Sequence, residues 1–167
     1  MSEEFYNAAV AGEIDELRRL LEKDPSLVHS VDKWGFTALH GVAGEDKLET
    51  ASFLLHQGAN PNAKNDEGIT PLHLAAYPSM VELLVRRGAE VDIRSNDGRT
   101  PLLVQAAEAE GFDVMSALLH LGADPKATDK RGQSALDVAR AREEEDKIEL
   151  LKPGEETKTK SWWKFWR

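Results

Sequence analysis

The side chains that could do chemistry in this chain are five histidines and thirty carboxylates, and there is no cysteine. Without cysteine, disulfides, thiolate zinc sites and cysteine nucleophiles are excluded. The spacings HExxH, GxSxG, GxGxxG and the Walker phosphate-binding loop do not occur, so metalloproteases, serine hydrolases and nucleotide-binding enzymes lack their minimal parts. Because no nucleophile, base and orienting group are gathered in the sequence, we expect no catalytic residue, no metal, no cofactor and no small-molecule substrate.

Four of the five histidines occupy equivalent places of an internal repeat. Glycines at 35, 68, 98 and 132 each stand two residues before a hydroxyl residue, with spacings of 33, 30 and 34, and Gly-Ala pairs at 58, 88 and 122 run in step with them. Two markers in one register indicate a repeat. His40 and His73 share one place in it, and His56 and His120 share another. His29 is left over, and a lone surface histidine is far more often inert than catalytic.

The repeated segments resemble the ankyrin repeat. They are TALHGVA at 37–43, TPLHLAA at 70–76 and TPLLVQA at 100–106, and the resemblance covers residues 4–151. It implies an all-α ankyrin-repeat solenoid of stacked helix-turn-helix pairs joined by β-turn loops. It also implies that His40 and His73 make a structural hydrogen bond to the neighbouring loop. Short cysteine-free chains of this sort resemble small bacterial ankyrin proteins.

Local signals agree with this arrangement independently. The threonines at 37, 70 and 100 can cap the first helix of each unit, and Pro71 and Pro101 suit the first helical position, where a missing N–H costs nothing. The glycines at 58, 88 and 122 follow apolar helical patterns and suit a left-handed C-cap. We predict one domain over 1–151, with an N-terminal cap (1–31), repeats at 32–64, 65–94 and 95–128, a C-terminal cap (129–151), and a flexible cationic tail (152–167).

The second full repeat departs from the others. After Ala76 the usual turn between the two helices is shorter by three residues. Ser79 and Glu82 have the spacing of a capping box, so we expect the second helix to begin cleanly just after Pro78. The short turn should leave a notch between the longer turns of its neighbours, which is either a foothold for a partner or a tolerated deletion, and the tolerated deletion is the favoured interpretation.

Charge and hydropathy limit the class of partner and the compartment. The net charge of −9 argues against a nucleic-acid partner, because binding a polyanion requires clustered basic residues. The sequence shows no secretory signal at its start and no stretch long enough to span a membrane, so we expect a cytoplasmic protein.

The surface of such a stack is expected to carry its function. Successive loop tips and first helices line one concave side and give an extended groove. We predict that a partner protein of unknown identity binds there through Lys33, Trp34, Phe36, Glu45, Asp66, Glu67, Ile69, Tyr77, Asn96, Asp97, Arg99, Lys130 and Arg131. The resemblance implies that Trp34, Phe36 and Ile69 lie on exposed loop tips. An aromatic anchor ringed by charges has the composition of an interface centre, so we expect this cluster to bind the partner. The alternative is that Trp34 folds back over the adjacent tip or the N-terminal cap.

The last seven residues, SWWKFWR, hold three of the four tryptophans. On a helix, the aromatic residues Trp162, Trp163, Phe165 and Trp166 would face one side, and Lys164 and Arg167 the other. Three interpretations stay open: a peripheral anchor on an anionic membrane surface, a docking peptide for a protein groove, or a segment that covers the repeats of its own chain. The first is slightly favoured because Trp prefers the headgroup region and basic residues are attracted to anionic lipid.

Taken together, the sequence predicts a non-catalytic protein-interaction module. One alternative is an inhibitor or antidote that occludes the active site of a partner enzyme. The other is an adaptor that the tail holds at the inner face of a membrane.

Overall fold

The computed structural model describes residues 3–152 of the 167-residue chain. Over that range its regular secondary structure is helical apart from two isolated β-bridges, Val31 with Thr37 and Thr128 with Ser134, which confirms the all-α class. The helices are α1 (Glu3–Ala11), α2 (Ile14–Lys23), the 3-10 helix η1 (Pro25–His29), α3 (Ala38–Ala43), α4 (Leu48–His56), α5 (Pro71–Leu74), α6 (Pro78–Arg86), α7 (Pro101–Ala107), α8 (Phe112–His120), α9 (Ala135–Ala141) and α10 (Glu145–Leu151).

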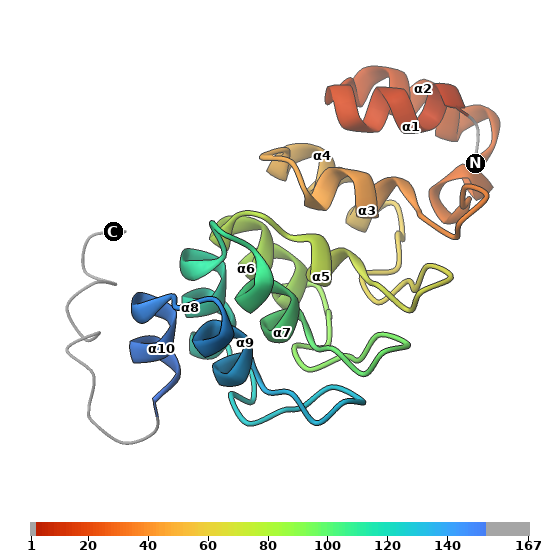
Figure 1. Ribbon diagram of the computed structural model, residues 1–167. Helices are drawn as coiled ribbons and strands as arrows, with labels where there is room; N and C mark the ends of the chain where they lie inside the picture. Colours follow the sequence, from red (N-terminus) through yellow and green to blue (C-terminus); the bar gives the residue numbers. More distant parts are fainter. Residues whose placement is uncertain (1–2, 153–167) are drawn as a thin grey trace.

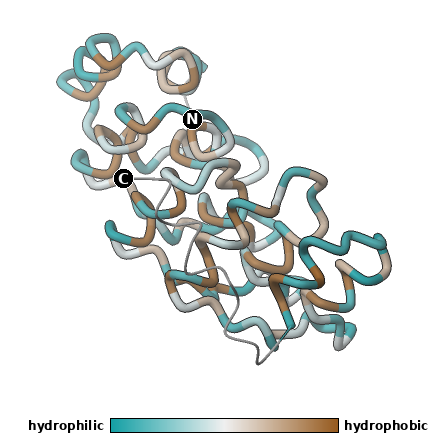
Figure 2. Tube along the Cα trace, turned by 90° about the vertical axis from the view of Figure 1, so that its left-hand side faces the viewer, coloured by the Kyte–Doolittle hydropathy of each residue, from teal (hydrophilic) through white to brown (hydrophobic). Residues whose placement is uncertain are grey.

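The helix pairs stack into an elongated body with two layers. Helices α3, α5, α7 and α9 form the first layer, helices α4, α6, α8 and α10 form the second, and the loops project from the side of the first layer (Figure 1). Apolar residues run along the helices and hydrophilic residues gather in the loops (Figure 2). The large side chains that are almost fully buried come from every helix pair but the last: Phe5, Leu17, Leu39, Leu54, Leu72, Met80, Leu84, Leu102, Met115 and Leu118. The core is therefore a continuous seam, and each unit depends on its neighbours for burial.

Threonine and histidine together start two of the first-layer helices. The backbone N–H of Thr37 donates to Nδ1 of His40 at 3.1 Å, and Nε2 of His40 lies 3.0 Å from the carbonyl oxygen of Ile69 in the next loop. Thr70 and His73 repeat this arrangement, with Nε2 of His73 3.0 Å from the carbonyl of Arg99. Since a carbonyl oxygen can only accept, Nε2 carries the proton and Nδ1 is the acceptor. The expected structural role of the two histidines is confirmed.

The ends of the second-layer helices also match the sequence signals. Gly58, Gly88 and Gly122 each stand two residues after the last residue of α4, α6 and α8, and have φ angles of 94°, 96° and 96°. Only glycine adopts this left-handed backbone freely, so the glycines at these positions predict where each helix ends and the chain reverses.

The capping box expected at the start of α6 is wrong. The N-cap residue is Tyr77, which makes no side-chain cap hydrogen bond, and Pro78 is the first residue of the helix. Ser79 therefore lies inside the helix, and Glu82 pairs with Arg86 at 3.3 Å instead of reaching back. The fixed φ of proline suits the first helical position, so the helix starts there without a side-chain cap.

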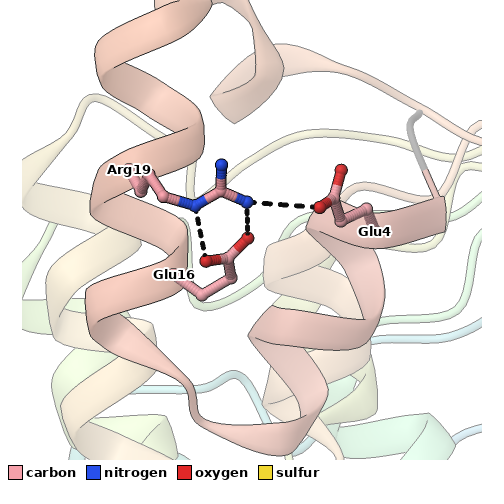
Figure 3. Close-up of polar contacts among 3 residues, drawn as sticks. All are labelled: Glu4, Glu16 and Arg19. Carbon is pink, nitrogen blue, oxygen red and sulfur yellow. Dashed lines mark hydrogen bonds and ion pairs between the residues drawn. The ribbon is translucent and has the colours of Figure 1, made fainter.

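An ion-pair cluster joins the two helices of the N-terminal cap (Figure 3). Nε of Arg19 on α2 donates to Glu16 at 2.7 Å, and Nη2 of Arg19 lies 3.3 Å from Glu4 on α1. Because these side chains are largely in contact with solvent, the cluster adds little stability. The buried Phe5 and Leu17 are the stronger link between α1 and α2.

Candidate functional site

Each loop ends in a tight turn, and the side chain of the first residue of the turn accepts hydrogen bonds from its backbone N–H groups. The carboxylate of Asp32 accepts the backbone N–H groups of Trp34 and Phe36 at 2.9 and 2.8 Å. Asn65 and Asp129 repeat this pattern in the second and fourth loops. The N–H groups of Gln133 and Arg131 hold the pKa of the Asp129 carboxyl below its ordinary value. The loop tips are therefore fixed before any partner arrives.

Backbone hydrogen bonds join the four tips into one row. The N–H of Asp66 donates to the carbonyl of Trp34 at 3.0 Å, the N–H of Asn96 to Glu67 at 2.9 Å, and the N–H of Lys130 to Asp97 at 2.9 Å. The side chain of Asn96 adds a bond to the carbonyl of Asp66 at 2.8 Å. The tip row is the set of residues brought together in this way: Lys33, Trp34, Asp66, Glu67, Asn96, Asp97, Lys130 and Arg131.

Trp34 is the accessible aromatic residue of the tip row. Its side chain is 57% exposed, and the ammonium of Lys33 lies 4.0 Å from the centre of its ring, in the geometry of a cation–π contact. Phe36 is half-buried and meets the ring of His40 edge-on at 5.4 Å. Ile69 is also half-buried. Phe36 and Ile69 thus pack at the bases of their loops, whereas Trp34 projects into solvent from its tip.

Besides Phe36 and Ile69, three of the predicted partner-binding residues lie apart from the tip row. Glu45 follows the end of α3 and Tyr77 follows the end of α5, at the turns between paired helices, and both are exposed. Arg99 is exposed at the base of the third loop, where its carbonyl accepts from His73. The predicted set therefore divides among the loop tips, the bases of the loops and the opposite ends of the first-layer helices.

The remaining predictions concern metals and the tail. Within residues 3–152 no group of three or more histidine, aspartate and glutamate side chains could hold a metal ion, and no helix is long and apolar enough to cross a membrane. The predicted tail anchor, Trp162, Trp163, Lys164, Phe165, Trp166 and Arg167, lies outside the described residues.

Among the buried polar residues that the sequence analysis missed, Gln105 and Lys147 bond to the preceding unit. Gln105 is 5% exposed, and its side-chain amide donates to the carbonyl oxygens of Ala75 and His73 at 3.1 and 3.4 Å. The side chain of Lys147 is 3% exposed, and its ammonium donates to the carbonyl of Glu108. The available signal for Gln105 was its place five residues after Thr100, where the other repeats have an apolar residue.

Comparison with known proteins agrees with the repeat geometry. The family described as ankyrin repeats (3 copies) matches residues 5–94, 42–129 and 77–161. The chain is 33% identical over 134 residues to the human transient receptor potential cation channel subfamily A member 1. The aligned residues cover 77% of this chain and 12% of that protein. It is 37% identical over 127 residues to the human neurogenic locus notch homolog protein 2, which covers 73% of this chain and 5% of that protein.

The zebrafish (Danio rerio) neurogenic locus notch homolog protein 1 is 36% identical over 135 residues, which cover 77% of this chain and 6% of that protein. The chain therefore spans only a small part of the length of these relatives, and the similarity concerns a shared module. From the family match and the repeated helix pairs, the chain belongs to the ankyrin repeat family.

Proposed function

We propose that this protein binds a partner protein through the tip row, with Trp34 as the main anchor and without catalysing a reaction. Ankyrin repeats are protein–protein interaction modules, and the proposal assigns that role to one surface of this chain. The observation that carries it is the 57% exposure of Trp34 on a turn that hydrogen bonds to Asp32 and to the neighbouring tip hold in place. Exposure of a large aromatic side chain on a rigid support is typical of a binding hot spot.

The rigidity of the tip row supports the proposal. Hydrogen bonds between Trp34, Asp66 and their neighbours fix the turns in the free protein, so binding would not require the loops to become ordered. A surface ordered in advance loses less conformational entropy on association. The charges follow an order along the row, with Lys33 at one end, Asp66, Glu67 and Asp97 in the middle, and Lys130 and Arg131 at the other end. A partner should therefore present a basic centre between acidic ends.

The test is affinity enrichment with matched variants. Wild type, Trp34→Ala and Ser116→Ala would each be immobilised and exposed to an extract of the cells that make the protein, and bound proteins would be quantified by mass spectrometry. Ser116 is an exposed residue of α8, away from the loop tips, so its variant controls for non-specific loss. We expect at least one protein to be enriched by wild type and Ser116→Ala and lost with Trp34→Ala.

The purified partner would then decide between the alternatives. Calorimetry should show a loss of about 2 kcal/mol or more in binding free energy for Trp34→Ala, as is typical of an aromatic hot spot. If the partner is an enzyme whose activity falls on stoichiometric addition of wild type, the protein is an inhibitor. Equal enrichment of every protein by wild type and Trp34→Ala would contradict the assignment of the tip row.

A further inference from the structure

The shortened repeat uncovers a small apolar surface between two acidic turns. Eighteen residues separate Thr70 from Gly88, whereas 21 and 22 residues separate the equivalent threonine and glycine of the neighbouring repeats. Helix α5 consequently ends after four residues, and Ala76 and Tyr77 are exposed, Tyr77 by 42%. The alanines equivalent to Ala76, Ala43 and Ala106, are completely buried. We call the surface formed by Ala76 and Tyr77 the notch.

The backbone of the notch is already bonded on both sides. The N–H of Ala76 donates to the carbonyl of Ala43 in the preceding repeat at 3.3 Å, and Gln105 of the following repeat donates to the carbonyl of Ala75 at 3.1 Å. These bonds fix the notch between the two neighbouring turns. An occupant would therefore be held by apolar contact and by charge rather than by free backbone groups.

The edges of the notch are acidic. The preceding turn carries Glu45 and Asp46, and the following turn carries Glu108 and Glu110, all exposed. The cation of the preceding turn, Lys47, donates to the carbonyl of Ala11 in the N-terminal cap and so is directed away from the notch. Phe112, 38% exposed at the start of α8, adds a second accessible ring next to the following turn. The surface thus fits a segment that combines aromatic rings with positive charge.

We propose that the notch binds the aromatic and cationic segment 161–167 of the same chain. This segment, SWWKFWR, has three tryptophans, one phenylalanine and two basic residues, whereas residues 3–152 carry 28 acidic and 17 basic side chains. The chemistry of the segment is complementary to the notch in both respects. Because the notch and the tip row lie at opposite ends of the first-layer helices, this docking goes beyond the proposed function and leaves the tip row free.

The length of chain permits docking within one molecule. Lys147 near the start of α10 donates to the carbonyl of Glu108, which places that helix start beside the turn that follows the notch. Two steps of helix packing at 8–10 Å each cover at most about 20 Å, and α10 adds about 10 Å at 1.5 Å per residue. Because the helix axis is roughly perpendicular to the direction of stacking, Lys152 lies within about 22 Å of the notch. Residues 153–160 can span about 27 Å when extended.

Tryptophan fluorescence of the full chain tests the proposal. Trp34→Phe leaves the three tryptophans of the segment as the only ones, and a synthetic peptide of residues 153–167 gives the emission of the segment in water. We expect the emission of the Trp34→Phe chain to lie at shorter wavelength than that of the peptide, because the rings leave water. The difference should shrink with added salt, since salt screens attraction between exposed charges.

Two further substitutions locate the site. Ala76→Arg in the Trp34→Phe chain adds bulk and positive charge at an exposed residue of the notch, and Ser116→Arg adds the same side chain on the outer face of α8. Ala76→Arg should return the emission to that of the peptide, and Ser116→Arg should not. Circular dichroism would check that both variants stay folded, and Tyr77→Ser, which adds no charge, should move the emission in the same direction as Ala76→Arg.

Three results would overturn the proposal. The first is emission identical to that of the peptide in the Trp34→Phe chain. The second is a shift that depends on protein concentration, because the segment would then bind a second copy. The third is a shift that occurs only on addition of phosphatidylserine vesicles and is insensitive to Ala76→Arg, because the segment would then be a membrane anchor. None of these results concerns the tip row, so the proposed function is tested independently by the enrichment experiment with Trp34→Ala.

Discussion

The side-chain amide of Gln105 donates a hydrogen bond to the carbonyl oxygen of Ala75 in the preceding repeat, at 3.1 Å. This bond is one of a series, because each unit bonds the end of the first helix of the preceding unit. Lys47 donates to Ala11, the N–H of Ala76 to Ala43, and Lys147 to Glu108. A helix leaves its last carbonyl groups without intrahelical partners, so these bonds satisfy the polar groups and also join neighbouring units.

Gln105→Leu should destabilise the stack by about 1–3 kcal/mol, because it leaves two buried carbonyl groups without a donor. Urea unfolding monitored by circular dichroism would measure the change. Gln57→Leu alters an exposed glutamine at the end of α4 and is the matched control, which should leave stability within about 0.5 kcal/mol of wild type. Equal values for the two variants would show that water replaces the amide of Gln105.

The role of Gln105 marks the limit of what the sequence could predict. The repeat period, the capping threonines and the left-handed glycines are local signals, so the helix pairs and their order could be predicted from them. Gln105 compensates for a deletion that lies thirty residues earlier in the chain, and only the packing of adjacent repeats brings the two together. The division of the predicted partner-binding set has the same origin. Trp34 and Tyr77 are both exposed, but Trp34 lies on a loop tip before a first-layer helix, whereas Tyr77 follows the end of one.

The stability of the stack should fall as the pH drops below about 6.5, the ordinary pKa of histidine. Burial lowers the pKa values of His40 and His73 in the folded state, and Nδ1 of each ring accepts from a backbone N–H, so the folded state favours the neutral ring. The unfolded chain then binds more protons than the folded chain. The stabilisation is complete above the unfolded pKa and is lost progressively toward the lower folded pKa, by up to about 1.4 kcal/mol per pH unit for each histidine.

Urea unfolding between pH 8 and pH 5 would measure this slope. His73→Leu is the informative variant, because Leu103 occupies the equivalent place in the next repeat. It should lower stability at pH 8 and also reduce the slope. An unchanged slope would show that other groups cause the acid sensitivity.

Trp34→Ala and Phe36→Ala should differ in their effect on folding. Trp34 is mainly in contact with solvent, so its removal should change stability by less than about 0.5 kcal/mol. Phe36 is half-buried against His40, and its removal should cost about 2 kcal/mol, roughly half of the value for a fully buried phenylalanine. Thermal and urea unfolding of the two single variants would test this. A large loss for Trp34→Ala would show that this ring belongs to the core and would weaken the proposed function.

Gly68→Ala should be more harmful than Gly88→Ala. Both glycines have positive φ angles, 75° and 96°, so alanine at either position costs about 1–2 kcal/mol of backbone strain. A Cβ atom on Gly68 would also lie 2.7 Å from the backbone nitrogen of Asn96, whereas nothing lies within 4 Å at Gly88. The collision should displace one loop tip from the next and disturb the bond from Asn96 to Glu67. Equal losses of stability in the two variants would mean that the tips move apart freely.

Lys147→Met should loosen the C-terminal helix pair from the rest of the stack. The buried ammonium of Lys147 serves the carbonyl of Glu108 and also pairs with Glu144 at 2.5 Å, so its loss leaves both acceptors without that donor. Glu144 keeps a second partner in Arg142, 2.9 Å away. The loss of the hydrogen bond to the carbonyl of Glu108 should therefore have the larger effect. Hydrogen exchange of the α10 amides should therefore accelerate more than exchange in α6.

Lys152→Met is the control for this prediction. It removes an exposed lysine paired with Glu149 at 3.6 Å and should leave exchange unchanged, since exposed ion pairs contribute little. Adding Glu144→Gln to Lys147→Met should recover part of the protection, because it neutralises the carboxylate that has lost one of its two cationic partners. If the double variant is no better protected than Lys147→Met alone, the bond to Glu108 rather than the ion pair is the contact that holds the last helix pair.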